Sequence, residues 1–182
     1  TLVNALRGSR LSVRLIDGQS PPQLSARAAG SCQGHALVAG VSPRVSAINL
    51  ASEALLKRIG AWPAPAAQQC AYNQMSVWDS RGTASIQFDA DLAVADHLGT
   101  IIENDQLTQA LFDRGLSVDE AQIDYDHGVE AIERIDGGYR VSLVGGESIS
   151  CKLLVGADGG ASTVRALTQV KTLEWSYQQA AL

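Results

Sequence analysis

The sequence predicts an α/β fold with a strong antiparallel component. Short segments that alternate apolar and polar residues recur along the chain, and segments with apolar residues at helical spacing lie between them. Near the C-terminal end, the glycine pairs Gly137-Gly138 and Gly145-Gly146 separate three consecutive strand-like segments. With 182 residues, 46% of them hydrophobic and 18% charged, the chain is long and apolar enough to bury a core.

Charge and cysteine content exclude several classes of protein. The net charge of -5 repels a phosphate backbone and disfavours binding to nucleic acid. No segment approaches the about 20 consecutive apolar residues of a membrane-spanning helix, and Thr1 does not begin a typical secretion signal. The cysteines, Cys32, Cys70 and Cys151, form no metal-binding motif and are expected to be reduced thiols of a cytoplasmic protein.

The N-terminal segment predicts the end of a helix followed by a strand. Apolar residues within Thr1–Leu6 have helical spacing, and Gly8 follows where a helix can stop. Residues Leu11–Ile16 then alternate as in a strand and lead into Asp17-Gly18, which places an acid at the end of that strand. The next segment, Gln19–Arg44, has no sustained period and is expected to be a long loop.

The middle of the chain predicts a helix and then a hairpin. Ser46 is expected to cap a helix over Ile48–Ile59, which ends near Gly60. Residues 75–78 and 84–88 alternate on either side of a turn and predict two antiparallel strands.

A third strand is predicted at Leu98–Ile102, directly before a second helix. The residues that follow it, Glu103-Asn104-Asp105, offer caps and N-terminal acids for that helix, whose apolar stripe includes Leu107 and Leu111.

Three further strands are predicted at Val129–Ile135, Tyr139–Val144 and Ile149–Val155, arranged as an antiparallel meander. The end of the last segment, Lys152–Val155, is a continuous apolar run of the kind found in a central strand that is covered on both faces.

The segment Gly156–Arg165 carries the clearest indication of a binding site. Its glycines let the backbone approach a ligand, Asp158 can accept hydrogen bonds from sugar hydroxyls, and Arg165 can pair with an anion. The helix that starts near Ser162 is expected to offer free N–H groups to a phosphate. A plain strand-to-helix turn capped by Asp158 explains the same spacing equally well.

At this point the sequence resembles a known family. Gly156-Ala-Asp-Gly-x-x-Ser-x-Val-Arg165 is similar to the Asp-Gly motif of the flavoprotein aromatic hydroxylases, which are FAD-dependent monooxygenases. Four more blocks resemble the ubiquinone-biosynthesis branch of that family. They are Arg44-Val-Ser-Ala-Ile48 with Ile59-Gly-Ala-Trp62, Met75-x-Val-Trp-Asp79, Leu98-Gly-x-Ile-Ile-Glu-Asn104 and Trp175-x-Tyr-x-Gln178.

The resemblance implies a partial FAD/NAD(P)-binding three-layer fold with additional antiparallel strands. Residues 1–68 and 97–170 would form part of the FAD-binding domain, and residues 69–96 and 171–182 would be edge strands of the substrate domain. Members of the family open with a strand and a GxGxxG loop that are not found in this sequence. The chain is therefore expected to be truncated at both ends and inactive by itself.

The function implied by the resemblance is hydroxylation of an aromatic ring, with a polyprenylated phenol of ubiquinone biosynthesis as substrate. FAD would be the cofactor, expected to be lost from this truncated chain, and NAD(P)H the reductant. We assign no catalytic side chain and no metal ligand. The residues expected to bind the cofactor are Asp17, Arg44, Glu103, Gly156, Asp158, Gly159 and Arg165.

Four of these residues have specific roles by resemblance, each beside a simpler explanation. Asp17 would bind the adenosine ribose, or merely form a turn. Arg44 would lie along the ribityl and pyrophosphate, or be an ordinary solvated arginine. Glu103 would contact the cofactor, or cap a helix. Asp158 would be linked to FAD binding and to the use of NAD(P)H.

The expected partners are a hydrophobic aromatic substrate and either further copies of the chain or other ubiquinone-biosynthesis proteins. Peripheral contact with the inner membrane is also expected. The alternative is a non-catalytic remnant that acts as an interaction or scaffold module, and a bound flavin would distinguish the two. His35, His97 and His127 lie far apart in sequence, and the acids of Asp119–Asp126 suit a solvated edge better than a calcium loop.

Overall fold

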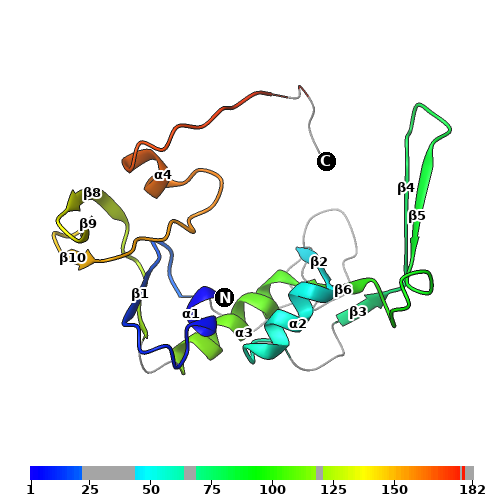
Figure 1. Ribbon diagram of the computed structural model, residues 1–182, viewed down its shortest axis with the longest axis horizontal. Coiled ribbons are helices and arrows are strands. Elements are labelled where there is room, and N and C mark those ends of the chain that lie inside the picture. Colours follow the sequence, from blue (N-terminus) through cyan, green and yellow to red (C-terminus); the bar gives the residue numbers. More distant parts are fainter. Residues whose placement is uncertain (22–43, 64–68, 118–120, 177, 179–182) are drawn as a thin grey trace, which may run out of the picture. The chain divides into compact units, whose positions relative to one another are not determined.

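The computed structural model describes residues 1–21, 44–63, 69–117, 121–176 and 178, which divide into two compact units (Figure 1). Unit 1 comprises residues 1–15 and 21–123, and unit 2 comprises residues 16–20 and 124–182. Within the described ranges, no helix is long and apolar enough to cross a bilayer. The chain combines four helices with several antiparallel sheets in its described part, so the predicted α/β class with antiparallel strands is confirmed.

Unit 1 is built on a three-stranded antiparallel sheet with β6 (Gly99–Glu103) in the middle. It lies between β2 (Val45–Asn49) and β3 (Gln69–Tyr72), with Ala47 opposite Ile101 in the register. Because it has neighbours on both sides, β6 is the most buried of the three strands, and Ile102 is only 1% exposed. A Cβ atom at Gly99 would collide with the carbonyl oxygen of Ile48, so this position requires glycine.

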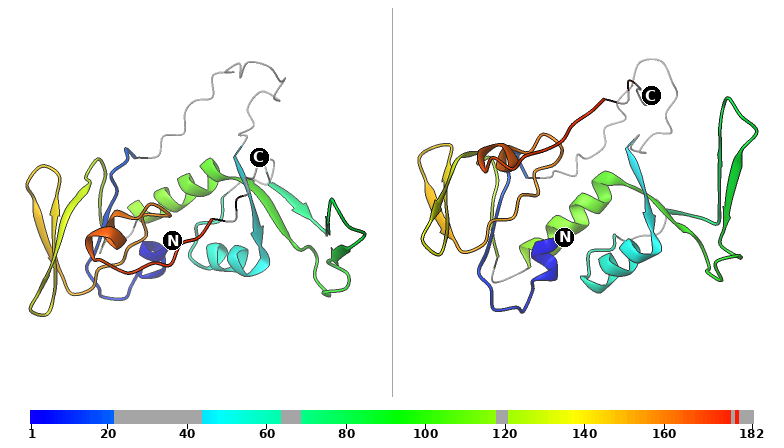
Figure 2. Two further views of the ribbon diagram at one scale, coloured as in Figure 1. Left: turned by 90° about the horizontal axis from the view of Figure 1, so that it is seen from above. Right: turned by 45° about the horizontal axis from the view of Figure 1, so that its top comes forward.

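Two helices follow directly from strands of this sheet (Figure 2). Helix α2 (Leu50–Arg58) continues from β2, and α3 (Asn104–Leu116) continues from β6. Their apolar residues meet in one core cluster, formed by Leu56, Ile59 and Ala61 with Ile48, Leu55, Trp62, Leu107 and Leu111 around it. The short helix α1 (Leu2–Ala5) is tied to α3 by a hydrogen bond from the Asn4 side chain to the carbonyl of Leu111, 3.0 Å long.

The predicted start of the first long helix is wrong. Residues 45–49 form β2, and the cap is Asn49, whose side chain accepts a hydrogen bond from the Ser52 N–H at 2.8 Å. Ser46 lies within the strand and donates to the Asn104 side chain at 2.6 Å. Five backbone positions of β2 pair with β6, and this pairing holds the segment extended where helical spacing alone favoured a longer helix.

A buried carboxylate links α2 to β6. Glu53 is 6% exposed and accepts hydrogen bonds from Lys57 at 2.5 Å, Thr100 at 3.0 Å and His97 at 3.1 Å. Burial raises the pKa of the Glu53 carboxyl, but the hydrogen bonds from Lys57, His97 and Thr100 outweigh burial and lower that pKa to about 2. The carboxylate is therefore ionised and fully engaged over most of the pH range.

The predicted hairpin is confirmed. Strands β4 (Gln74–Trp78) and β5 (Ser85–Asp89) pair antiparallel in a two-stranded sheet that extends away from the rest of unit 1 in Figure 1. Every residue of β4 is exposed, because no other described strand joins this sheet.

Unit 2 contains the predicted antiparallel meander of β8 (Val129–Ile135), β9 (Gly138–Leu143) and β10 (Ser148–Cys151). The central strand β9 supplies its most buried residues, Val141 and Leu143.

The prediction that the third strand continues through Lys152–Val155 as a covered central strand is wrong. β10 ends at Cys151, and Leu153 and Val155 are 77% and 52% exposed. Among the described residues no strand lies beside this segment, so it joins no sheet and the side chains of Leu153 and Val155 stay exposed. The chain continues to the short helix α4 (Thr163–Leu167).

The N-terminal predictions are confirmed in outline. α1 is followed by Gly8 in the left-handed conformation, with φ +74°, and β1 (Val13–Ile16) then pairs with β7 (Ala121–Asp124). Most of the predicted loop at Gln19–Arg44 lies outside the described residues.

We predict that Glu53→Gln removes an acid-sensitive part of the stability of unit 1. The folded pKa of about 2 lies below the ordinary value of 4.5, so the contribution is complete above pH 4.5 and is lost as the pH falls towards 2. This depression corresponds to roughly 3 kcal/mol at pH 7. Urea unfolding followed by circular dichroism at several pH values should show a steeper loss between pH 4.5 and 2 in the parent chain than in the variant.

The matched control is Glu133→Gln on β8. Glu133 pairs with Arg140 at 2.8 Å, but both side chains are about half exposed, so its loss should change stability by less than about 1 kcal/mol. Equal acid sensitivity in the parent and the Glu53→Gln variant would contradict the prediction.

Candidate functional site

The Asp-Gly segment folds into a loop held by the carboxylate of Asp158. One oxygen of Asp158 accepts from the Ser162 hydroxyl at 2.5 Å, and the other accepts from the Val164 N–H at 3.0 Å. Ser162 in turn caps α4 by accepting from the Arg165 N–H at 3.0 Å. Asp158 therefore closes the loop onto the first turn of α4, as a capping residue does.

The two glycines beside Asp158 have different structural requirements. Gly159 has φ +85°, a backbone conformation that other residues rarely adopt, and a Cβ atom there would meet nothing within 4 Å. At Gly156 a Cβ atom would lie 3.0 Å from the side chain of Val164, so a larger residue would push the loop away from α4. Gly159 therefore shapes the turn, and Gly156 permits close packing of the loop against α4.

A cavity of about 440 Å³ lies against this loop within unit 2. Polar groups of Asp158, Ser162, Thr168 and Arg165 line it together with apolar and aromatic side chains. The remaining lining residues are Tyr139, Leu154, Gly156, Gly159, Val164 and Val170. The lining offers an acceptor carboxylate and a cation on one surface, which suits a ligand with hydroxyl and anionic groups.

The ionised form of Asp158 is favoured by its own loop. The hydrogen bond from Ser162 and, next, the bond from the Val164 backbone lower the pKa of the Asp158 carboxyl below its ordinary value. The carboxylate is fully exposed, so it stays accessible as an acceptor. Each carboxylate oxygen has capacity for a second hydrogen bond, so the capping contacts do not exclude a ligand hydroxyl.

The expectation that α4 offers free N–H groups to a phosphate is wrong. Its helix is only five residues long, and the N–H groups of Val164 and Arg165 already donate to Asp158 and Ser162. The Arg165 side chain donates to the carbonyl of Gly160 at 2.6 Å, which holds the guanidinium at the loop. An anion at this site would be met by the Arg165 guanidinium rather than by the helix end.

Asp17 lies in a second turn of unit 2, at the end of β1. Its side chain accepts from the Gln19 N–H at 2.9 Å, and its backbone N–H donates to the carbonyl of Asp124 at 2.9 Å. The Asp17 carbonyl accepts from the His127 N–H at 3.1 Å. Burial and then the negative charge of Asp17 raise the pKa of the Tyr125 hydroxyl. Asp17 therefore forms a turn in the structure, and its negative charge acts on the nearby Tyr125 hydroxyl.

Arg44 and Glu103 are brought together in unit 1. Val45 lies opposite Glu103 in the sheet register, and the Asn104 N–H donates to the Arg44 carbonyl at 3.0 Å. Glu103 occupies the N-cap position of α3 without a side-chain capping bond to the helix, and it is buried at 3% exposure. The explanation that Glu103 caps the helix through its side chain therefore does not hold, whereas Arg44 is exposed.

Two of the three histidines lie within the described residues, and each has a polar partner there. His97 bonds to Glu53, and His127 Nδ1 lies 2.5 Å from the carbonyl of Tyr125, while His35 lies outside the described residues. Across the described ranges, no cluster of three or more His, Cys, Asp or Glu side chains could hold a metal ion.

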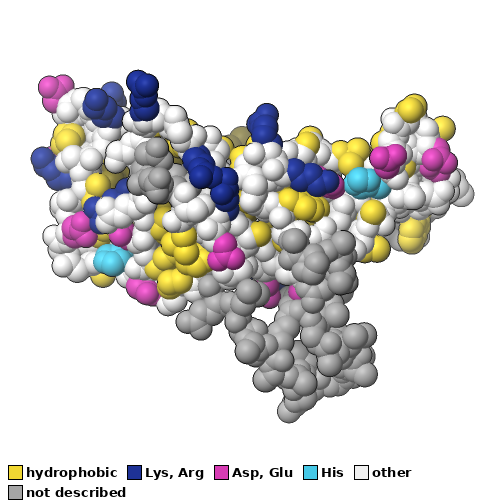
Figure 3. Space-filling model, turned by 90° about the horizontal axis from the view of Figure 1, so that it is seen from below, with side chains coloured by type: hydrophobic (Ala, Val, Ile, Leu, Met, Phe, Trp, Pro, Cys, Tyr) yellow, Lys and Arg dark blue, Asp and Glu magenta, His cyan; other side chains and the backbone are white. Residues whose placement is uncertain are grey.

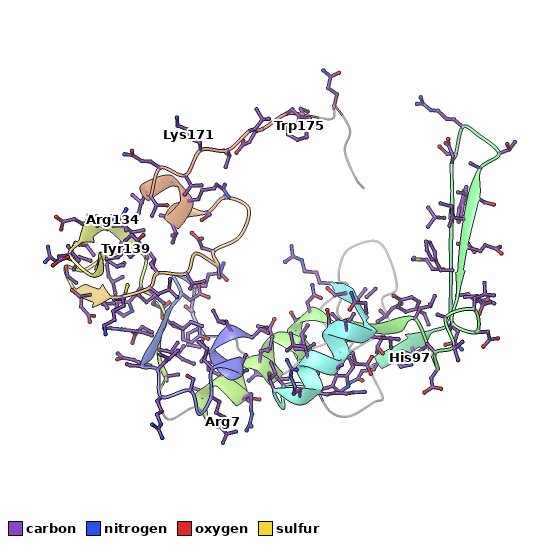
Figure 4. All side chains as sticks on the ribbon, in the orientation of Figure 1. Arg7, His97, Arg134, Tyr139, Lys171 and Trp175 are labelled. Atoms are coloured by element: carbon purple, nitrogen blue, oxygen red, sulfur yellow. The ribbon has the colours of Figure 1, made fainter. Side chains whose placement is uncertain are left out.

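Two features were missed by the sequence analysis. Tyr139 and Val170 line the cavity together with Asp158. Tyr139 comes from β9 (Figure 4) and Val170 from the segment after α4, so no local motif marks them. The Glu53 network was also missed. Glu53 and Lys57 at helical i,i+4 spacing gave a partial signal, whereas His97 and Thr100 lie more than 40 positions away.

Comparison of the chain with known proteins finds relatives that have a named function. No known family model matches this chain. The chain is 35% identical over 140 residues to 3-demethoxyubiquinol 3-hydroxylase of Escherichia coli, which covers 76% of this chain and 36% of that protein. It is 34% identical over 152 residues to the mitochondrial ubiquinone biosynthesis monooxygenase COQ6 of Danio rerio, covering 78% of this chain and 31% of that protein.

A third relative matches over the whole chain. Ubiquinone hydroxylase UbiL of Rhodospirillum rubrum is 29% identical over all 182 residues, which correspond to 39% of its length. The chain thus spans about a third of the length of the curated relatives that it matches.

Solved structures support the fold. The Diels-Alderase PyrE3 superposes with a TM-score of 0.66 at 17% identity, covering 92% of this chain and 32% of that one. PqsL of Pseudomonas aeruginosa, described as a probable FAD-dependent monooxygenase, superposes with a TM-score of 0.66 at 14% identity, covering 97% and 44%. At these identities the likeness concerns the fold alone. Together with the sequence matches, it confirms the resemblance: the chain is a homologue of the ubiquinone-biosynthesis hydroxylases.

We predict that Ser162→Ala raises the pKa of the Asp158 carboxyl towards its ordinary value. The Ser162 hydroxyl is the largest cause of the depression, and alanine cannot donate a hydrogen bond. Carbon-detected NMR titration of the aspartate side chains should register the rise. Ser142→Ala is the matched control because it also removes a serine hydroxyl from unit 2, one bonded to Ser148 and not to Asp158. An unchanged Asp158 titration in Ser162→Ala would contradict the prediction.

Proposed function

We propose that this chain forms part of an FAD-dependent monooxygenase that hydroxylates the aromatic ring of a polyprenylated phenol in ubiquinone biosynthesis. The observation that carries the proposal is the match to relatives named as ubiquinone-pathway hydroxylases, several of them above 30% identity over more than three quarters of this chain. The match to UbiL extends over all 182 residues and so includes the Asp158 loop.

The residues of the Asp158 loop fit a dinucleotide cofactor. An exposed, ionised carboxylate, a guanidinium and a glycine backbone with open space beside it line one cavity, and these are the groups that ribityl or ribose hydroxyls and phosphates require. In the proposed enzyme Asp158 accepts from a sugar hydroxyl, Arg165 meets an anionic group, and Gly156 and Gly159 let the backbone approach.

The remaining candidate residues are proposed to contact the same cofactor in the longer protein. Asp17 has a carboxylate at a strand end, where it can accept from ribose hydroxyls, as the family resemblance implies. Arg44 and Glu103 are neighbours at the edge of β2 and β6 and would serve the same cofactor. The domain assignment made from the sequence, with residues 69–96 and 171–182 as edge strands of a substrate domain, is part of this proposal.

The flavin, when bound, would supply the oxygen chemistry, with NAD(P)H as the proposed source of electrons. The side chains described here would bind and orient the cofactor, and none is proposed as a general acid or base. The proposed substrate is strongly apolar, so contact with the surface of a membrane, the inner membrane in a bacterium, is also part of the proposal.

A non-catalytic interaction module is the second candidate. It is favoured by the uncovered apolar surface of β4, β5 and the segment after β10, where large hydrophobic side chains are exposed. Flavin content separates the two candidates, because an interaction module has no need of the cofactor.

We predict that residues 1–182 alone purify without colour, whereas a longer hydroxylase that contains them binds FAD. Part of the proposed binding surface would be supplied by segments that the relatives have and this chain does not match. The absorbance spectrum near 450 nm after dialysis measures the difference. Stoichiometric FAD on residues 1–182 would contradict the first half of the prediction, and a colourless longer protein would overturn the proposed function.

In the longer protein, Asp158→Ala should weaken FAD retention by roughly tenfold to a hundredfold, because it removes a charged hydrogen-bond acceptor. Fluorescence titration of the apoprotein with FAD measures this effect. Glu133→Ala is the control, since it removes another exposed acid of unit 2, on β8, that lies outside the cavity lining. Equal FAD affinity in the Asp158→Ala variant and the parent would show that this carboxylate does not bind the cofactor.

A further inference from the structure

Tyr139 brings an aromatic ring to the Asp158 cavity from outside the Asp-Gly segment. It is the second residue of β9 and lies opposite Arg134 of β8 in the register (Figure 4). Side chains alternate along a strand, so Tyr139 shares a face of the meander with Val141 and Leu143, which are buried. The same face is turned towards α4, because residues of α4 line one cavity with Tyr139.

The Tyr139 side chain is half-buried and makes no hydrogen bond within the described part of the chain. The hydroxyl of a buried tyrosine usually has a hydrogen-bond partner. Apolar side chains reach the surface in several places on the face drawn in Figure 3, but the Tyr139 ring differs because it lines a cavity with a carboxylate and a guanidinium. The ring is therefore available to a ligand of this cavity.

The cavity lining combines polar groups with apolar surface. The polar groups belong to Asp158, Ser162, Arg165 and Thr168, and the apolar surface to Leu154, Val164 and Val170 together with the ring of Tyr139. A nucleotide has parts that match both, because its sugar hydroxyls and phosphate are polar and its base is a planar, largely apolar ring. The cavity volume of about 440 Å³ is within the ordinary range of small-molecule sites.

Charge alone does not select the ligand of this cavity. The lining holds one carboxylate, Asp158, and one guanidinium, Arg165, so its own charges balance. Outside the lining, the charged residues within three positions of it, or opposite Tyr139 in the register, are exposed: Arg134, Asp136, Arg140, Lys152 and Lys171. Most of these are cations and favour a phosphate-bearing ligand, but they do not distinguish a nucleotide from a phosphorylated sugar. The ring of Tyr139 can make that distinction.

We propose that Tyr139 is a specificity-determining residue of this cavity. Its ring packs against the planar ring of a nucleotide whose sugar hydroxyls meet Asp158 and whose phosphate meets Arg165. This inference rests on the proposed function, in which the cavity takes a dinucleotide cofactor. FAD and NAD(P)H share the required chemistry, and stacking on an aromatic side chain tolerates different rings.

The test measures how far binding to residues 1–182 depends on a ring. The probes are FMN, nicotinamide mononucleotide and adenosine monophosphate, and ribose 5-phosphate is the control that lacks a ring. In a ¹⁵N NMR titration, a ring-bearing probe should shift the amides of Gly156 and Gly159 with a dissociation constant on the order of 1 mM or lower. It should bind at least about fivefold more tightly than ribose 5-phosphate.

The preferred probe distinguishes the two cofactors. Preference for FMN assigns the cavity to FAD, and preference for nicotinamide mononucleotide assigns it to NAD(P)H. Preference for adenosine monophosphate is resolved by saturating the longer protein with FAD, which blocks this probe only if FAD itself occupies the cavity.

Two variants separate the ring of Tyr139 from the rest of the side chain. Tyr139→Leu removes the ring, so the preferred probe should bind within about twofold of ribose 5-phosphate. Tyr139→Phe keeps the ring and should retain most of the preference, losing less than about threefold. Ribose 5-phosphate should bind the parent and both variants alike, because Asp158 and Arg165 are unchanged. The dispersion of the NMR spectrum checks that each variant is folded.

A measurement on the parent chain tests the same contact without any substitution. Intermolecular nuclear Overhauser effects should join the ring protons of Tyr139 to the ring protons of the bound probe. Their absence would overturn the proposal, as would equal binding of ribose 5-phosphate and every ring-bearing probe, or equal losses in Tyr139→Leu and Tyr139→Phe. Failure of the hydroxylase proposal is distinguishable, because a colourless longer protein would leave ring-dependent binding to residues 1–182 intact.

Discussion

The number of neighbours that each strand has determines how much apolar surface this chain buries. β6 has a strand on either side and contains Ile102, one of the most buried residues, whereas β4 has one neighbour and no buried residue. β9 is central in its own sheet and is likewise the strand of unit 2 that buries Val141 and Leu143. Every described sheet has only two or three strands, so large hydrophobic side chains remain at the surface of both units.

The number of hydrogen-bond donors and the degree of burial likewise distinguish the two acidic residues Glu53 and Asp158. Glu53 is buried and has three donors, so it acts as a fixed link between α2 and β6. Asp158 is fully exposed and has two short-range donors from its own loop, so the carboxylate is oriented and ionised without being enclosed. A carboxylate in the first environment contributes to stability, and one in the second is suited to a ligand, because an incoming hydroxyl finds an acceptor whose geometry is already set. Capping and ligand binding are compatible at Asp158, although the sequence presented them as alternatives.

Most of the local structure could be predicted because it depends on neighbours close in sequence. The β4–β5 hairpin and the meander of β8, β9 and β10 follow from alternation and turn residues, and both are present. Predictions failed where distant partners decide the outcome. Ser46 is in a strand because residues 45–49 pair with β6, more than 50 positions away, and Lys152–Val155 is not a strand because the described chain supplies no neighbour for it. The Glu53 network and the contribution of Tyr139 to the cavity were unpredictable for the same reason.

The candidate binding residues share one further property. Each is held by bonds formed within its own few elements: Asp17 by Gln19 and Asp124, Arg44 by Asn104, and Asp158 by Ser162 and Val164. If a ligand binds these turns as they stand, it loses little conformational entropy in ordering them, because each turn is already fixed by its own hydrogen bonds. The binding groups are thus set locally, whereas the apolar surfaces beside them require partners from elsewhere.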